Sequence, residues 1–383
     1  MRIGIDIRLI GKKRTGDEAV VFNLVKNLAK IDQTNEYFLF TDVVDEEQLN
    51  VISTQIDISD KNNFKIISLP NRNKFTWNFW TLPKYLRRNP VDVFHTQYIT
   101  PWFVPKIIKI VTIVHDISFN SFPQLIKFSD LFFLKTLIPL SLRRANKIIG
   151  VSQFTRNEII KFYKIKPEKV DYIYDSVSDD FLNSQSGEEI PETKKEEIRK
   201  KYNLPEKFIL YMGTLQPRKN IPQLVEAYAA VENKLGGIKL VICGNRQAHN
   251  FDRKIDKAIA KNKLEENVIF PGFIEEEDKK TIFQMAYAFV FPSLYEGFGI
   301  PVLEAMSQKV PVLASDIPSL KEIAQDGALY FDATSIADFS QKLYDVCVND
   351  SLRAELIQSG VARIGFFSWK NSAQKMLAIY QEL

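Results

Sequence analysis

The sequence predicts an α/β protein with two parallel sheets, each covered by helices. The chain has 383 residues, about twice the size of an ordinary domain. Short β-branched runs alternate with helical patterns along its length, as in sheets built from strand–helix–strand units. A polar stretch near the middle, NSQSGEEIPETKKEE, interrupts this alternation and is typical of a linker. We therefore expect two doubly wound domains joined by that stretch.

In the first half, apolar runs predict strands and the segments between them predict helices. The clearest helix is Asp17–Ile31, in which Val20, Leu24 and Leu28 recur at helical spacing. The predicted strands are Arg2–Ile7, Tyr37–Thr41, Phe64–Ile67, Val91–His95, Lys109–His115 and Lys147–Val151.

The second half repeats the alternation after the polar stretch. We expect a first domain over 1–182, a linker over 183–200 and a second domain from 201. The predicted strands are Phe208–Met212, Lys239–Cys243, Val268–Phe270, Ala288–Phe291 and Val310–Ala314. The predicted helices are Ile221–Leu235, Ile255–Lys261, Glu277–Met285 and Val302–Ser307.

Composition restricts the class of protein. Two cysteines are too few for a disulfide framework, and the opening MRIGIDIRLI reads as a strand rather than a secretion signal, so a cytoplasmic protein is expected. The longest apolar stretch, Leu131–Leu142, contains Lys135 and is too short to cross a bilayer.

Positive charge is concentrated in the first half. Residues 61–169 hold 19 Lys and Arg against 5 Asp and Glu, a net +14, which leaves −10 for the rest of a chain whose total is +4. The aromatic residues interleaved with these cations would suit anionic lipid headgroups, a phosphorylated lipid acceptor or nucleic acid. They are Phe75, Trp77, Phe79, Trp80, Trp102 and Phe103. Basic residues scattered over a solvated domain are the simpler alternative.

The most informative stretch is FPSLYEGFGIPVLEAM, residues 291–306. It reads as a strand, a glycine-bearing loop and a helix with Pro301 near its start, where backbone N–H groups are left for an anion. Glu296 and Glu304 flank this loop. Glu304, one turn into the helix, suits the two hydroxyls of a ribose, although a capping carboxylate and a loop glutamate would give the same letters.

A second stretch, YMGTLQPRKNIPQLVEAY, spans residues 211–228. A strand ends at Gly213, and a short loop delivers Arg218 and Lys219 ahead of the next helix. Arginine grips phosphate oxygens in pairs and lysine adds a mobile charge, so the two predict a diphosphate site. A solvated Arg–Lys pair near a helix start is the structural alternative.

Two histidines stand at predicted strand ends in the first half. His115 ends the apolar strand IVTIVHD and is a candidate to contact a sugar or the reacting centre, or a satisfied strand-end residue. His95, in VFHTQY with Gln97 and Tyr98, is expected on the acceptor side or in the structure. No Asp-x-Asp pair, His/Cys cluster, Ser/His/Asp arrangement or Walker loop is visible, so we expect no metal.

At these residues the chain resembles family 4 of the retaining glycosyltransferases of the GT-B fold. The resemblance rests on E-G-F-G-x-P-x-x-E-A, which stands at residues 296–305, and covers nearly the whole chain. It implies two Rossmann-like domains facing a cleft, a second domain over 201–365, and a terminal helix over 366–383 that crosses back to the first domain.

The resemblance also implies roles for individual residues. Arg218 and Lys219 would bind the donor diphosphate, Glu304 the ribose and Glu296 the transferred sugar. From its place at a strand end rather than from the resemblance, His115 is expected to be catalytic together with Glu296, Arg218 and Lys219. Gly16, followed here by Asp17 and Glu18, stands in the N-terminal loop that usually carries two glycines. Further donor contacts are expected at Gly16, Gly213, Gly244, Phe273, Ile274, Phe298, Gly299 and Ile300, and acceptor contacts at His95, Gln97 and Tyr98.

The resulting prediction is a metal-independent, retaining hexosyltransferase that uses a GDP- or UDP-linked sugar and no other cofactor. The stretch HDISFNSFP, residues 115–123, resembles members that use mannose and favours GDP-mannose. We expect a glycan or lipid-linked acceptor in cell-surface polysaccharide synthesis, a peripheral position on the inner face of an anionic membrane, and no nucleic acid. A phosphorylase, a sugar-nucleotide epimerase and a non-enzymatic basic binding module are the alternatives.

Overall fold

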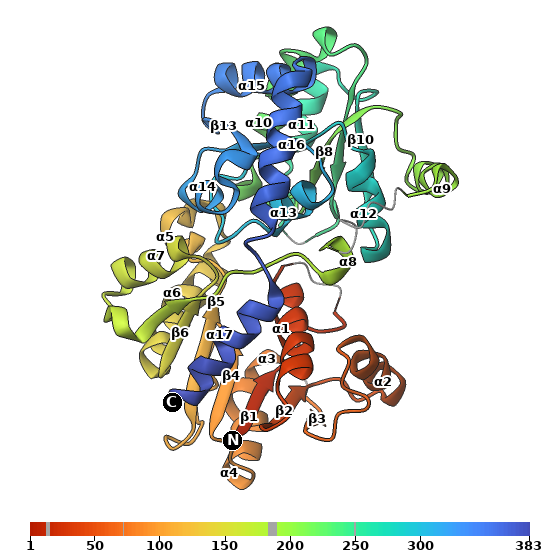
Figure 1. Ribbon diagram of the computed structural model, residues 1–383. Coiled ribbons are helices and arrows are strands. Elements are labelled where there is room, and N and C mark those ends of the chain that lie inside the picture. The colour runs from red at the N-terminus through yellow and green to blue at the C-terminus, as the bar shows by residue number, and fades with distance from the viewer. Residues whose placement is uncertain (13–15, 72, 183–189, 249) are drawn as a thin grey trace. The chain divides into compact units, whose positions relative to one another are not determined.

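The computed structural model describes residues 1–12, 16–71, 73–182, 190–248 and 250–383, which form two compact units. The first unit contains Met1–Asp175 together with Ser368–Leu383, and the second contains Ser176–Phe367. Each unit has its own parallel sheet, seen as arrows in Figure 1, with helices on the faces of the sheet. Both predicted sheets are therefore confirmed.

The first unit holds a seven-stranded sheet in the order β3-β2-β1-β4-β5-β6-β7. All its pairings are parallel, and β1 lies between β2 and β4, with Ile3 opposite Tyr37 and Val93. The central strands are almost wholly buried because helices cover both faces, which explains their continuous apolar runs, whereas the edge strands β3 and β7 are only partly buried. The strands are β1 Arg2–Asp6, β2 Glu36–Thr41, β3 Phe64–Ser68, β4 Val93–Gln97, β5 Lys109–Val114, β6 Lys147–Gly150 and β7 Val170–Tyr172.

Helices connect these strands, and one of them lies beside the C-terminal helix of the chain. Helix α1 (Asp17–Ile31) packs along the C-terminal helix α17 (Trp369–Gln381), as Figure 1 shows. The other helices of this unit are α2 Glu46–Gln55, α3 Lys74–Thr76, a π-helical turn Trp77–Thr81, α4 Leu82–Arg88, α5 Ser118–Ser121, α6 Phe128–Arg144 and α7 Gln153–Tyr163, with 3-10 turns at Pro123–Leu125 and Pro167–Lys169.

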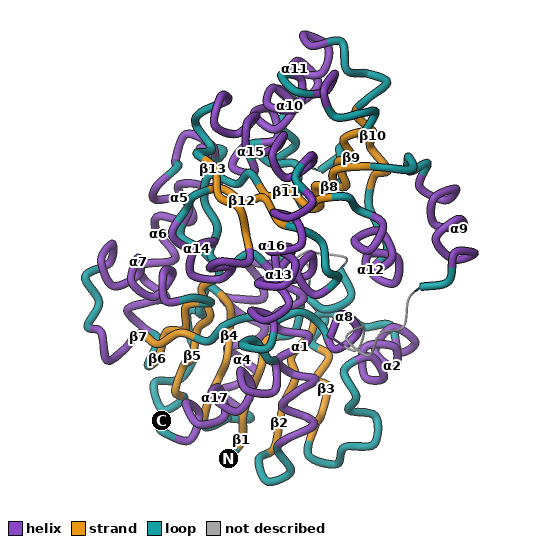
Figure 2. Tube along the Cα trace, turned by 45° about the horizontal axis from the view of Figure 1, so that its top comes forward, coloured by secondary structure: helices purple, strands orange, loops and turns teal. Residues whose placement is uncertain are grey.

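The second unit holds a six-stranded parallel sheet in the order β10-β9-β8-β11-β12-β13. The first strand of the unit, β8, again lies between the second and the fourth, so both units share one winding. Figure 2 shows the strands of each sheet running next to one another in orange. They are β8 Phe208–Met212, β9 Lys239–Cys243, β10 Val268–Gly272, β11 Ala288–Phe291, β12 Val312–Ser315 and β13 Ala328–Phe331.

The predicted helices of the second unit are present, and three of them, α11, α12 and α13, begin one or two residues earlier than predicted. The predicted helix over 221–235 is helix α10 followed by a separate 3-10 turn at Glu232–Lys234. The helices are α8 Asp179–Leu182, α9 Glu192–Tyr202, α10 Ile221–Ala229, α11 Lys254–Asn262, α12 Glu276–Met285, α13 Ile300–Ser307, α14 Pro318–Ala324, α15 Ile336–Val348 and α16 Asp350–Ile364, with 3-10 turns at Pro217–Lys219 and Gln325–Gly327.

The junction between the halves differs from the expected linker over 183–200. The first unit ends at Asp175, before residue 182, and residues 183–189 lie outside the described residues. From Glu192 the chain is helix α9, whose charges pair three residues apart, as between Arg199 and Glu196 at 2.9 Å. Tyr202 on this helix is buried and donates to Asp278 at 2.7 Å. Because paired charges rather than apolar residues cover most of this helix, its sequence has the polar pattern of a loop.

The terminal helix returns to the first unit, as the resemblance implied, although the unit boundary lies at Ser368 rather than Phe366. The Ser372 hydroxyl donates to the Tyr174 carbonyl at 2.6 Å, and Lys375 Nζ donates to the Tyr172 carbonyl at 2.5 Å. Near its end, the Tyr380 hydroxyl meets Nδ1 of His95 on β4, and both residues are buried. The helix is therefore fixed to the sheet by polar contacts as well as by packing.

We expect Tyr380→Phe to lower the free energy of unfolding by about 1–3 kcal/mol, because it leaves the buried Nδ1 of His95 without a partner. Urea unfolding at pH 8 measures this change. Tyr344→Phe, at a half-buried position of α15, is the control and should change little. Equal stability of Tyr380→Phe and the parent would contradict a fixing role for this contact.

In the described part of the chain, every helix is too short or too polar to span a membrane.

Candidate functional site

The candidate site of the second unit lies where the winding of its sheet reverses. β8 has β9 on one side and β11 on the other, and the loops that leave β8 and β11 run in opposite directions along the sheet. In doubly wound sheets, ligands bind beyond the carboxyl ends of the strands at this point. Both stretches singled out in the sequence, 213–219 and 296–300, follow these two strands.

Three glycines lie where the ends of β8, β9 and β10 come close together. The Gly213 N–H donates to the Cys243 carbonyl at 3.1 Å, and the Gly244 N–H donates to the Gly272 carbonyl at 2.9 Å. A Cβ on Gly244 would lie 2.4 Å from the Gly213 carbonyl oxygen, which is closer than real contacts allow. The absence of a side chain at Gly244 is thus what lets the loops after β8 and β9 approach each other.

Gly244→Ala should therefore destabilise the second unit by about 2–3 kcal/mol and weaken nucleotide binding, because backbone rather than a flexible side chain must move. Gly365→Ala is the matched control, since its Cβ would meet Ala362 at an ordinary 3.7 Å. Thermal unfolding with and without GDP measures both effects. A Gly244→Ala protein that unfolds and responds to GDP like the parent would show that the loops have room to separate.

Two cations from the β8 loop meet one carboxylate from the β11 loop. Arg218 Nη1 donates to Glu296 Oε2 at 3.1 Å and to the Tyr295 carbonyl at 3.0 Å, while Lys219 Nζ donates to Glu296 Oε1 at 2.5 Å. The Leu294 N–H also donates to the Arg218 carbonyl at 2.9 Å, so the two loops are joined through the backbone. The sequence-predicted pair and the first glutamate of the motif thus form one cluster.

The electrostatics of Glu296 follow from this cluster. Its side chain is only 9% exposed, and burial by itself would raise its pKa. The charges of Lys219 and Arg218 outweigh burial and lower the pKa of Glu296 to about 2. Glu296 is therefore ionised at any physiological pH, and the cluster keeps one net positive charge.

Helix α13 begins beside this cluster. Gly299 precedes it with a φ of 111°, a backbone conformation that side chains rarely adopt, and a Cβ there would lie 2.7 Å from Leu320. Pro301 stands in the first turn of the helix. The side chain of Phe298 is buried edge-on against Phe367 with ring centroids 5.7 Å apart, so any donor contact from this residue would come from its backbone.

Glu304 on α13 has the opposite environment from Glu296. It is 9% exposed, and burial raises its pKa to about 7. The charge of Lys279 on α12 lowers this pKa, and that of Glu276 raises it further. The two glutamates of one motif therefore differ in pKa by about five units when the site holds no ligand.

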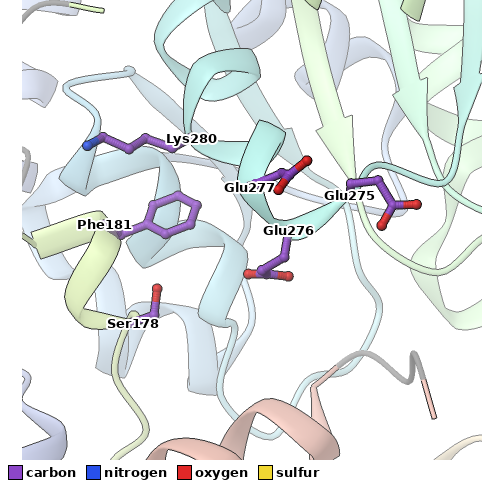
Figure 3. Close-up of a pocket in the computed structure, with 6 residues that line it drawn as sticks. All are labelled: Ser178, Phe181, Glu275, Glu276, Glu277 and Lys280. Carbon is purple, nitrogen blue, oxygen red and sulfur yellow. The ribbon is translucent and has the colours of Figure 1, made fainter. Parts of the chain in front are cut away.

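A pocket of about 600 Å³ opens between α8 and the start of α12. Figure 3 shows Phe181 and Ser178 of the α8 segment on one side and Glu276 on the other, with Glu275 and Glu277 pointing away from the ring. The remaining lining residue is Lys280. The loop before α12 contains the predicted contacts Phe273, which is exposed, and Ile274, which is buried. This acidic stretch was not among the predicted site residues, although three glutamates in a row follow PGFI in the sequence.

Predicted residues of the first unit gather at the corresponding reversal of its own sheet. His115 Nε2 lies 2.6 Å from Gln97 Oε1, and its Nδ1 lies 3.9 Å from Asp17 at the start of α1. The Tyr98 hydroxyl accepts from the Asp116 N–H at 3.1 Å. Gly16, with a φ of 72°, immediately precedes α1, and no atom lies within 4 Å of where its Cβ would stand. The contact between Asp17 and His115 was not foreseen.

His95 does not fit its predicted role as an acceptor contact. It is 1% exposed, and its Nδ1 pairs with Tyr380 inside the first unit. Burial, together with the nearby His115, lowers the pKa of His95 to about 3, so the ring is neutral. Its place in the middle of β4, which is buried on both faces, explains why it fixes the terminal helix instead.

Among the residues that the structure describes, no three His, Cys, Asp or Glu side chains are grouped as a metal site would require.

Comparisons with known proteins agree with this architecture. The family described as "Glycosyltransferase Family 4" matches residues 15–181, and "Glycosyl transferases group 1" matches residues 194–363. O-antigen chain mannosyltransferase B of Escherichia coli is 27% identical over 376 residues, which cover 96% of each chain. O-antigen chain mannosyltransferase RfbU of Salmonella typhimurium is 30% identical over 217 residues, 57% of this chain and 55% of that protein.

Solved structures show the same fold. The structure of HepE from Anabaena in complex with UDP and glucose matches with a TM-score of 0.74 and 15% identity, over 100% of both chains. The two family matches occupy the two units in turn, and each unit has the doubly wound sheet of the GT-B fold. The second half of the chain matches the family described as "Glycosyl transferases group 1", and the first half matches "Glycosyltransferase Family 4". The chain therefore belongs to glycosyltransferase family 4 and is a glycosyltransferase.

Proposed function

We propose that this enzyme transfers a hexose, with retention of configuration at the anomeric carbon, from a nucleotide diphosphate sugar to a glycan or lipid-linked acceptor in cell-surface polysaccharide synthesis. Two relatives bear the name O-antigen chain mannosyltransferase, which supports mannose as the sugar and GDP-mannose as the donor. HepE was solved with UDP and glucose, so UDP-hexoses are the competing donors.

The observation that carries the proposal is the cluster of Arg218, Lys219 and Glu296 beside the start of α13. Its net positive charge and the N-terminus of the helix both attract a diphosphate. Because the site is preformed and largely buried, its charges act on the leaving group without first having to reorganise.

The proposed step breaks the bond between the anomeric carbon and the diphosphate oxygen and forms a bond from that carbon to the acceptor oxygen. Arg218 and Lys219 stabilise the charge that the diphosphate gains. A diphosphate oxygen takes the proton of the acceptor hydroxyl on the same face of the sugar, which retains the configuration. Glu296 holds the sugar and Glu304 the ribose, and no metal is required. His115 stays a predicted catalytic residue, with His115→Ala as its test.

A thermal-shift series with GDP, UDP, dTDP and ADP identifies the base. A nucleotide at 100 times its dissociation constant stabilises the folded protein by about 2.7 kcal/mol, and we expect GDP to give the largest shift. A larger shift with UDP would reject GDP-mannose as the donor.

Turnover then tests the reaction itself. GDP-mannose should release GDP only when an acceptor is present, and the product should have the α configuration of the donor by NMR. Phosphate-dependent cleavage of a glycan would indicate a phosphorylase, and conversion of the nucleotide sugar alone would indicate an epimerase. An inverted product would reject retention.

A further inference from the structure

One face of the first unit exposes a group of large aromatic side chains. We call it the aromatic surface and define it by Phe75, Trp80, Trp102, Phe103, Phe132 and Phe133, whose exposed fractions run from 43 to 66%. Soluble proteins rarely leave so many large aromatics exposed together unless they form a contact surface.

Ring contacts show that these side chains are neighbours. Phe75 lies 5.7 Å from Phe133, which lies 6.1 Å from Phe132, between ring centroids. Trp80 lies 5.9 Å from Phe103. Phe79 stacks on Trp102 at 5.5 Å and contacts Phe103 at 6.4 Å. Phe75 and Phe79 are four residues apart on one continuous helical segment, so the two groups adjoin.

The segment that carries the aromatic surface is anchored from its other side. Trp77, Leu82 and Leu86 lie on the same run of helix, 74–88, and are buried in the core of the first unit. The run contains a π-helical turn over Trp77–Thr81, where the Leu82 N–H donates to the Trp77 carbonyl. The Trp102 N–H donates to the Asn78 carbonyl at 3.0 Å, which fixes the neighbouring loop. The exposed rings are thus held on a rigid base.

Exposed lysines lie close to these rings along the chain. Residues 75–144 hold nine Lys and Arg against three Asp and Glu. Lys84 follows Trp80 by about one turn, Lys106 follows Phe103 by three residues, and Lys135 follows Phe132 by three, and all three lysines are exposed. Aromatic rings within a border of cations suit the headgroup region of an anionic bilayer, where rings enter the interface and lysines stay at the phosphates.

We propose that the aromatic surface binds this enzyme to a bilayer of anionic phospholipid. The proposal rests on the function proposed above, because a lipid-linked acceptor would then be met at the same surface. Single-stranded nucleic acid is the less suitable partner, because Ile107, on the loop after Phe103, is 80% exposed and an aliphatic side chain offers no face for base stacking. Phe128, at the start of α6, is 84% exposed and extends the exposed apolar area further.

Cosedimentation with vesicles tests the proposal on the full chain. We expect binding to phosphatidylglycerol/phosphatidylethanolamine vesicles, at least tenfold weaker binding to phosphatidylcholine vesicles, and release at 0.5 M salt. Trp80→Ala combined with Phe103→Ala should weaken binding to the anionic vesicles at least tenfold. Phe162→Ala, a 44% exposed aromatic on α7 outside the aromatic surface, should stay within twofold of the parent.

A second measurement needs no variant. Brominated anionic lipids should quench the fluorescence of the parent chain, because Trp80 and Trp102 are exposed whereas Trp77 and Trp369 are buried. The proposal is overturned if the parent does not bind anionic vesicles, if the double variant binds like the parent, or if it instead loses self-association in sedimentation or binding to a single-stranded oligonucleotide. Transfer to a soluble acceptor should be unchanged in the double variant, so failure of vesicle binding and failure of the proposed reaction are distinguishable.

Discussion

Replacing Arg218 by alanine is expected to lower the rate of sugar transfer by about 100- to 1000-fold, and Lys219→Ala should have an effect of the same order. Both cations face Glu296 in a buried cluster, where they are fixed before the reaction begins. Their attraction for the diphosphate grows as the bond to the sugar breaks, so the loss should appear mainly in kcat. Steady-state release of the nucleoside diphosphate in the presence of acceptor measures this loss.

A matched control separates this effect from general loss of charge. Lys261 on α11 is 71% exposed and pairs with Glu226 at 3.0 Å, and Lys261→Ala should transfer at the parent rate. Lys219→Arg keeps the charge and should recover part of the activity. If a folded Arg218→Ala protein had an unchanged kcat, the cluster would not bind the leaving diphosphate and the proposed mechanism would be wrong.

Glu304→Gln is expected to stabilise the ligand-free protein at pH 8 by up to about 3 kcal/mol while it weakens donor binding. Burial raises the pKa of Glu304 from 4.5 to about 7, so the folded chain holds this proton more tightly than the unfolded chain does. The carboxyl therefore costs no stability below pH 4.5, and the cost grows as the pH rises toward 7, where it is complete. Urea unfolding from pH 4.5 to 8 should show the difference between variant and parent opening over this window.

Glu296→Gln should have the opposite effect on the free energy of unfolding and is the matched comparison for Glu304→Gln. Because Lys219 and Arg218 lower the pKa of Glu296 to about 2, its ionised form stabilises the folded chain above pH 4.5, and this stabilisation is lost as the pH falls toward 2. The Gln variant should therefore be less stable than the parent at pH 8, by about 3 kcal/mol, because the buried Lys219 and the partly buried Arg218 would lose their ionised partner. If both substitutions changed the free energy of unfolding at pH 8 in the same direction, the opposite environments of Glu296 and Glu304 would be contradicted.

The same pKa shift predicts how donor binding should depend on pH if Glu304 binds the ribose as proposed. Burial outweighs the attraction of Lys279 and makes the ionised carboxylate costly, and two ribose hydroxyls that donate to it would offset this cost, so donor affinity should fall as the pH drops below 7 and the carboxyl becomes protonated. Functional sites often carry such costs, which is why a stabilising substitution there can remove activity.

Much of the fold could be predicted from local sequence because buried strands and amphipathic helices have distinct periods. The predicted strands in both halves are present, with ends that shift by one or two residues. Two strands were missed. β7 has only three residues with Asp171 at its centre, and β13, at the edge of its sheet, is a four-residue run with Tyr330 half-buried, so neither has a long apolar pattern. Helix α9 was mistaken for linker because paired charges rather than apolar residues fill most of it.

The site was predictable where its chemistry lies within one short loop. The motif at residues 296–305 and the pair Arg218–Lys219 were predicted to lie together, and Arg218 does contact Glu296. They are neighbours because both loops follow strands that end at the same edge of a sheet. Contacts between distant segments were not predictable. His95 and Tyr380 are 285 positions apart, and nothing in either local sequence indicates that they meet.

Sequence alone thus determined the class of the fold, the two units, the family and the two loops that form the candidate site. Only the tertiary structure decided that two cations would pair with Glu296 while burial would dominate the pKa of Glu304, that His95 would fix the terminal helix, and that the rings of the aromatic surface would remain exposed. Which helices and strands form depends mainly on nearby residues, so local sequence patterns predict them. Ionisation and exposure depend on which distant side chains and how much solvent surround a group, and these are fixed only when the elements pack.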